Sequence, residues 1–239
     1  MPDPTVIAID WSGRKGADQI HYIRAAVVSP DGTIDIWCDL TRNDVIEELM
    51  DFPGDVVVGF DFSFGFPAWV SDCRGLDGPS LWDVVRSEGE TWLRDAPEPF
   101  FGPKATRRRT DVELWRATEK VHRAKSTFQI AGAGAVGTGS IRGMPLLTQL
   151  AQSGYSIWPF DAAGARTVVE IYPKVLRPHA RPSLPRRVAR AVTNSDDTRD
   201  AVLSALVMHD ERHQLTALVP ALDARTRAEG QVWTPNFAR

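Results

Sequence analysis

The first forty residues contain three short runs of apolar and polar positions, and turn-forming residues separate one run from the next. The runs are residues 5–10 (TVIAID), 19–28 and 33–40 (TIDIWCDL), and they are rich in the β-branched and aromatic residues that favour strands. Glycine and proline mark the turns between them. Because the connections are short, we predict an antiparallel meander of three strands.

A helix and a fourth strand follow the meander. Thr41 and Asp44 have the spacing of a capping box, with Asp in place of Glu, and predict a helix over residues 41–52. Residues 55–62 (DVVVGFDF) are apolar without alternation, which is typical of a strand buried on both faces. A strand reached through a helical crossover normally lies parallel to its neighbour, so we expect this strand beside residues 5–10.

The remaining elements complete an α/β pattern. Apolar spacing predicts helices, and one β-branched run predicts a fifth strand: the helices cover 80–95, 110–124, 141–152 and 196–213, and the strand covers 167–171. We predict a mixed five-stranded sheet flanked by helices, with the fourth and fifth strands parallel to the first. Residues 65–155 would form a helical and loop insertion between the last two strands of a single domain over residues 1–239.

The composition is that of a folded protein from a reducing compartment. Hydrophobic residues make up 43% and charged residues 25% of the 239 positions, a balance that argues against intrinsic disorder. No apolar run approaches the roughly 18 residues of a membrane span, and the N-terminus has no signal-peptide pattern. Cys38 and Cys73 form no CxxC motif, so neither a disulfide framework nor a Cys-rich zinc site is expected. We expect a cytoplasmic protein that does not enter a membrane.

Basic residues are concentrated in two segments. The net charge is +5 over residues 104–125 and +6 over residues 171–195, although the whole chain carries −3. Two interpretations remain open at this point, namely a surface that binds a polyanion and a pair of solvated faces.

Acidic residues occur where the predicted elements end or begin. Asp10 and Asp61 lie at the carboxyl ends of two strands expected to be adjacent and parallel, about 4.8 Å apart. Two carboxylates that close repel each other unless a proton or a cation lies between them, which suggests a metal site. Asp197 and Asp200 are three apart on a predicted helix and share one face, and Glu170 ends the fifth strand. Taken singly, each acid also fits a turn, a helix start or a solvated strand end.

Two further motifs are weaker. Gly132, Gly134 and Gly137 have the spacing of a dinucleotide fingerprint, but they do not follow the first strand of a βαβ unit. Close backbone packing is the favoured interpretation, with phosphate binding by backbone N–H groups as the alternative. His209 and His213 have a zinc-binding spacing without the glutamate of metalloproteases, so an exposed polar helix end is favoured.

Four motifs in this order resemble a known family. They are Asp10-Trp-Ser-Gly, Gly59-Phe-Asp-Phe-Ser-Phe-Gly-Phe-Pro67, Val169-Glu-Ile-Tyr-Pro173 and Asp197-x-x-Asp200-Ala-Val-Leu-Ser-Ala205. Together they resemble the domain of unknown function 429 family, whose members are regarded as predicted nucleases with the RNase H-like fold. The resemblance extends from Val6 to about Met208. The last motif also looks like the helix of Holliday-junction resolvases, in which two aspartates three apart bind metal.

The resemblance implies an RNase H-like sheet and metal ligands at Asp10, Asp61, Asp197 and Asp200. Glu170 matches the family's Glu-x-Tyr-Pro element and joins these four as a candidate catalytic residue. Where the resolvases have a glutamate, this chain has Asp61, which is shorter by one methylene.

The expected function is therefore hydrolysis of phosphodiester bonds in DNA or RNA with Mg²⁺ or Mn²⁺, which prefer oxygen ligands. The expected contacts to backbone phosphates are Lys104, Arg107, Arg108 and Arg109. Two alternatives remain, a non-catalytic binding or scaffold protein on the same fold and an actin-like phosphotransferase. The second usually needs two such domains, for which 239 residues are few. Nucleic acid is the expected partner, and a homodimer is left open.

Overall fold

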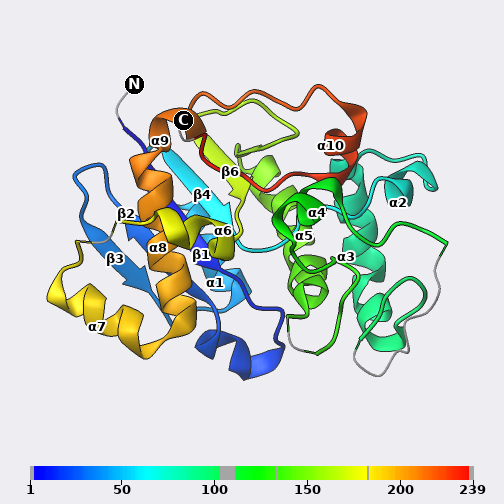
Figure 1. Ribbon diagram of the computed structural model, residues 1–239, viewed down its shortest axis with the longest axis horizontal. Helices are drawn as coiled ribbons and strands as arrows, with labels where there is room; N and C mark the ends of the chain where they lie inside the picture. The colour runs from blue at the N-terminus through cyan, green and yellow to red at the C-terminus, as the bar shows by residue number, and fades with distance from the viewer. Residues whose placement is uncertain (1–2, 103–110, 133, 182, 237–239) are drawn as a thin grey trace.

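The computed structural model describes residues 3–102, 111–132, 134–181 and 183–236. In this part of the chain a mixed sheet has six strands in the order β3-β2-β1-β4-β6-β5 (Figure 1). The strands are β1 (Thr5–Asp10), β2 (Arg24–Val28), β3 (Ile34–Trp37), β4 (Val56–Phe60), β5 (Ser156–Ile157) and β6 (Arg166–Glu170). The first three are antiparallel neighbours, and β4, β6 and β5 continue the sheet in parallel. The predicted α/β class, the antiparallel meander, the position of β4 beside β1 and the parallel direction of β6 are confirmed.

The number of strands differs from the predicted five. The additional strand, β5, has two residues, and its backbone pairs in parallel with Thr167 and Val168 of β6 at the edge of the sheet. A run of two residues has no periodicity of its own, so only its pairing with β6 defines it as a strand.

Helices cover both faces of the sheet and build a region beside it. Their bounds are η1 (Gly16–His21), α1 (Arg42–Met50), α2 (Trp69–Asp72), α3 (Gly78–Asp95), α4 (Ala117–His122), α5 (Val136–Gln152), α6 (Pro173–Leu176), η2 (Arg177–His179), α7 (Arg186–Asn194), α8 (Asp196–Asp210), α9 (Arg212–Leu215) and α10 (Ala224–Glu229). Figure 1 shows α8 crossing one face of the sheet over β1 and β2, and α3, α4 and α5 gathered beside the sheet. Among these described residues, no helix has the length and apolar character needed to cross a membrane.

Alternating side chains of the central strands pack into two separate hydrophobic cores, one on each face of the sheet. Ile7 and Ile9 of β1 point to the core that includes α1, α3 and α5, whereas Val6 and Ala8 point to the core under α8. This division follows from the two-residue period of a strand. The apolar face of α8, which includes Val202 and Ala205, is fully buried there. The polar residues of α8 therefore lie on the sides of the helix that do not pack against the sheet.

Local signals account for the helix starts. Thr41 accepts a hydrogen bond from the Asp44 N–H, and the Asp44 carboxylate accepts one from the Thr41 N–H, so the predicted capping box is present. The predicted helix over residues 110–124 is shorter, since α4 is confined to Ala117–His122. Arg116 precedes α4 in an extended conformation, and its buried ion pairs hold it there.

Candidate functional site

Two aspartates lie side by side at the carboxyl edge of the sheet. Ile9 is paired with Phe60 in the parallel register of β1 and β4, and the Asp61 N–H continues the ladder by donating to the Ile9 carbonyl at 3.0 Å. Asp10 therefore ends β1 at the level where Asp61 leaves β4. This adjacency is the one that the sequence predicted for strands joined by a helical crossover.

The environment of this pair opposes ionisation. Burial is the largest effect that raises the pKa of Asp10, to about 9, and the negative charges of Asp61, Asp197 and Asp200 add to it. Burial likewise raises the pKa of Asp61 to about 8, with contributions from the charges of Asp200 and Glu170. Arg24 opposes the shift at Asp10, and its guanidinium is held by the carbonyls of residues 20 and 23. Without a cation the pair therefore retains protons near neutral pH, because the surrounding protein compensates too little of the negative charge that ionisation would create.

Helix α8 brings the other two aspartates to the same place. Ser195 caps the helix by accepting from the Thr198 N–H at 3.1 Å, so Asp197 and Asp200 lie in its first two turns. Burial raises the pKa of both carboxyls, and their charges in turn raise the pKa of Asp10. The structure therefore brings together four of the five acids selected from the sequence.

Within the described residues, one cation forms an ion pair with this group. Arg177 Nη1 donates to Asp200 Oδ1 at 2.8 Å, and its charge lowers the pKa of Asp200 and opposes the increase at Asp61. In the sequence, Arg177 is one of six basic residues between 171 and 195, and nothing distinguishes it from the others. Its role in the site depends on the packing of the short helices α6 and η2 against α8.

The donor set is suited to a hard cation, although the arrangement of the side chains is incomplete. Carboxylate oxygens are the ligands that Mg²⁺ and Mn²⁺ prefer. Within the described ranges, however, no group of three or more His, Cys, Asp or Glu side chains is placed to hold a metal ion. A metal site at Asp10, Asp61, Asp197 and Asp200 therefore requires side-chain movement, and the metal would compete with Arg177 for Asp200.

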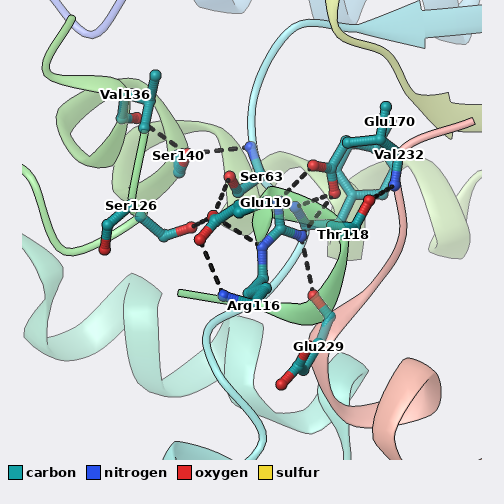
Figure 2. A network of polar contacts seen from close by, with 12 residues as sticks. Ser63, Arg116, Thr118, Glu119, Ser126, Val136, Ser140, Glu170, Glu229 and Val232 are labelled. Atoms are coloured by element: carbon teal, nitrogen blue, oxygen red, sulfur yellow. Dashed lines mark hydrogen bonds and ion pairs between the residues drawn. The ribbon is translucent and has the colours of Figure 1, made fainter. Parts of the chain in front are cut away.

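Glu170 lies in a different environment from the four aspartates. It is 2% exposed and forms a two-pronged pair with Arg116, with Nη2–Oε1 at 2.5 Å and Nη1–Oε2 at 2.9 Å (Figure 2). The Phe64 N–H also donates to Glu170 Oε2 at 3.0 Å. Both carboxylate oxygens are thus occupied by protein donors, and the negative charge of Glu170 also raises the pKa of Asp61.

Arg116 is the centre of this buried network. Its Nε donates to Glu119 Oε1 at 2.9 Å, and its Nη1 also donates to the Glu229 carbonyl at 2.9 Å (Figure 2). The Glu229 carboxylate accepts from the N–H of Ala117 at 2.6 Å and from that of Ala68 at 3.1 Å. The network therefore fastens α4 and α10 to the segment that follows β4, which is the segment that begins with Asp61.

Sequence reasoning did not find this network. Arg116 was counted within the basic stretch 104–125, whose two interpretations were a polyanion-binding surface and a solvated face, and its 1% exposure is compatible with neither. The one local signal is the spacing of Arg116 and Glu119, which form the N-terminal capping arrangement of α4.

A small cavity borders both the network and one of the aspartates. Its volume is about 40 Å³, and its lining includes Asp61, Ser63, Lys125, Glu170 and Tyr172. Such a space is large enough for an ordered water. Lys125 is exposed at this cavity and is a cation close to the site, whereas Lys104, Arg107, Arg108 and Arg109, the predicted phosphate contacts, lie outside the described residues.

Of the three glycines with fingerprint spacing, Gly137 packs closely against neighbouring backbone, as the favoured interpretation predicts, whereas Gly134 contacts only the Lys125 side chain. A Cβ on Gly137 would lie 2.2 Å from the Thr127 carbonyl oxygen, whereas a Cβ on Gly139 would meet nothing closer than Trp11 Cδ1 at 3.6 Å. Gly13, in the turn after Asp10, approaches the first turn of α5 in the same way. The loop thus helps to place the turn that follows β1.

Gly137→Ala is expected to lower the free energy of unfolding by about 1–3 kcal/mol, because backbone atoms would have to move to admit the methyl group. Gly139→Ala, two residues along the same helix, is the matched control. It should be neutral or stabilising by up to about 1 kcal/mol, since alanine favours the helix and the space is available. Urea denaturation of both variants measures the difference, and equal effects would contradict this account of Gly137.

The two histidines do not form a zinc site on one helix. His209 belongs to α8, which ends at Asp210, and His213 belongs to the separate short helix α9. The i, i+4 geometry that made them candidates is therefore absent.

The chain was compared with protein-family models, curated proteins and solved structures, and none of these comparisons gave a match.

Proposed function

We propose that this chain is a divalent-metal-dependent nuclease with an RNase H-like fold, related to the domain of unknown function 429 family. The observation that carries the proposal is the convergence of Asp10, Asp61, Asp197 and Asp200, with raised pKa values, at the carboxyl edge of β1 and β4. The meander followed by parallel strands supports the fold assignment. Excess negative charge in a partly buried group is stabilised by a cation, which Mg²⁺ or Mn²⁺ would supply.

The proposal assigns a role to each side chain. Asp10 and Asp61 would hold the cation from the sheet, and Asp197 and Asp200 would hold it from α8. When bound, the metal would activate a water and stabilise the leaving oxygen of a phosphodiester. Glu170 would act as a positioning residue, because its hydrogen bond with the Phe64 N–H anchors the segment that begins with Asp61.

Nucleic acid is the proposed substrate. A phosphate that approaches four carboxylates needs cations beside them, and Lys125 at the cavity and Arg177 at Asp200 are in suitable places. Lys104, Arg107, Arg108 and Arg109, which lie outside the described residues, are proposed as further contacts to backbone phosphates.

The test is a cleavage assay on single-stranded, duplex and branched DNA and RNA with added Mg²⁺ or Mn²⁺. The wild type should cut at least one substrate, and EDTA should stop the reaction. Asp61→Asn should reduce the rate about 100-fold or more, because the metal's stabilisation of the transition state contributes several kcal/mol. Asp210→Asn, at the exposed end of α8 (61% exposed side chain), is the matched control and should cut at the wild-type rate. Undiminished cleavage by the Asp61→Asn protein would place the activity elsewhere.

A non-catalytic nucleic-acid-binding protein is the second candidate. It is favoured by the Arg177–Asp200 ion pair and by the absence, among the described residues, of three acids placed for a metal. A titration with Mn²⁺ separates the two functions. A nuclease should show a higher melting temperature as the ion binds the folded state, whereas a binding protein with a degraded site should show no change.

A further inference from the structure

Arg177 occupies a fixed place on the border of the carboxylate group. It begins η2 directly after α6, and both short helices pack against α8. Pro173 and Pro178 restrict the backbone on either side of it. Its Cα is therefore held in place, although its side chain is long enough to change direction.

The contacts of Arg177 are few for a guanidinium in a partly buried place. One nitrogen, Nη1, donates to Asp200 Oδ1 at 2.8 Å. Among the described residues the Arg177 guanidinium has no second hydrogen bond, and the side chain is 33% exposed. Arg24, on the other side of the group, has Nη1 bonded to two backbone carbonyls at 2.7 Å. Arg177 is therefore the cation of this site that can leave its partner.

We propose that Arg177 is an exchangeable counterion of the site, which holds Asp200 in the absence of metal and releases it to a divalent cation. The released guanidinium then binds a phosphate of the nucleic-acid substrate. The proposal rests on the metal-dependent nuclease function proposed above and adds a specific role for a residue outside the carboxylate group.

Electrostatics supports the exchange. A divalent ion carries twice the charge of a guanidinium and can be shared by several carboxylates, so it competes effectively for Asp200. A partly exposed ion pair contributes little net free energy and offers little resistance to this competition. The planar guanidinium has several N–H donors in an arrangement that matches two phosphate oxygens, so its next partner is an anion.

The first measurement is the affinity of the protein for Mn²⁺ alone, by isothermal titration calorimetry without nucleic acid. Arg177→Gln should bind Mn²⁺ about fivefold more tightly than the wild type, because the ion no longer competes with the guanidinium. Arg199→Gln is the matched control, since Arg199 pairs with Asp196 at 2.9 Å on α8 and its loss removes the same charge from the vicinity. This control should change the affinity less than twofold.

The second measurement is binding of a fluorescent phosphorothioate oligonucleotide, which resists hydrolysis, with and without Mn²⁺. The wild type should gain affinity when the ion is added, and Arg177→Gln should gain about fivefold less although it binds the ion more tightly. Arg177→Lys retains the charge without the fork of donors, so its Mn²⁺ affinity should stay near the wild-type value while the gain for the oligonucleotide falls. Opposite changes in the two affinities are not expected from a damaged fold.

The outcomes separate the two proposals. If the wild type binds no Mn²⁺, the nuclease function fails, and the role of Arg177 fails with it. If the wild type binds Mn²⁺ but Arg177→Gln binds it equally or more weakly, the counterion role is overturned and the nuclease function remains. If Arg199→Gln gained as much Mn²⁺ affinity as Arg177→Gln, the effect would come from the change in net charge. That result would also overturn the role assigned to Arg177.

Discussion

Arg116→Met is expected to destabilise the protein by about 3–5 kcal/mol at neutral pH. The substitution leaves the carboxylates of Glu119 and Glu170 buried without the cation that pairs with both, and an uncompensated buried charge is among the most costly single changes. Methionine has a similar length and fills much of the same space, so the loss of stability reflects the missing charge more than the missing volume. Urea denaturation monitored by circular dichroism measures the change.

The control for this prediction is Arg94→Met. Arg94 pairs with Asp95 at the surface, where the two side chains are 69% and 51% exposed, and the substitution should change stability by about 0.5 kcal/mol or less. Similar effects of both substitutions would refute the structural importance of the network.

Asp10→Asn is expected to stabilise the metal-free protein by on the order of 2 kcal/mol at pH 8. The pKa of Asp10 is about 9 in the folded protein, against an ordinary value of 3.8. Between these values the folded state keeps a proton that the unfolded chain has released, so wild-type stability falls as the pH rises. Asparagine does not titrate, so the stability of the Asp10→Asn protein relative to the wild type should increase from pH 5 to pH 9.

Chemical denaturation in EDTA across this pH range tests the prediction, with Asp210→Asn as an exposed control of equal charge change. Adding millimolar Mn²⁺ should reverse the order at pH 8. The wild type gains stability from an ion that binds its folded state, and Asp10→Asn lacks one of the ligands. An Asp10→Asn protein that is no more stable than the wild type in EDTA would mean that the carboxylates do not repel each other as proposed.

The carboxylate pair at the sheet edge is the part of the site that could be predicted from the sequence. Runs of β-branched residues predict β1 and β4, and the helical crossover through α1 predicts that β4 is parallel to β1 and lies beside it. Asp10 and Asp61 come at the ends of these runs, so their proximity needed no knowledge of the rest of the chain. The spacing of Asp197 and Asp200 likewise predicts a shared helix face, although the sequence does not specify which surface that helix covers.

The sequence by itself therefore determined the α/β class, the antiparallel meander, the position of β4 beside β1 and the proximity of Asp10 and Asp61, because these depend on local periodicity and on connection rules. The tertiary structure alone decided the partners of the charged side chains. Arg116 pairs with Glu170, 54 positions away, and Arg177 pairs with Asp200, 23 positions away, and in the sequence both arginines look like ordinary members of basic stretches. Strand β5 is similar, because two residues become a strand only beside β6. The physical reason is that ion pairing and strand pairing depend on distance in space, whereas the hydrophobic pattern of a chain records only which face of each element is buried.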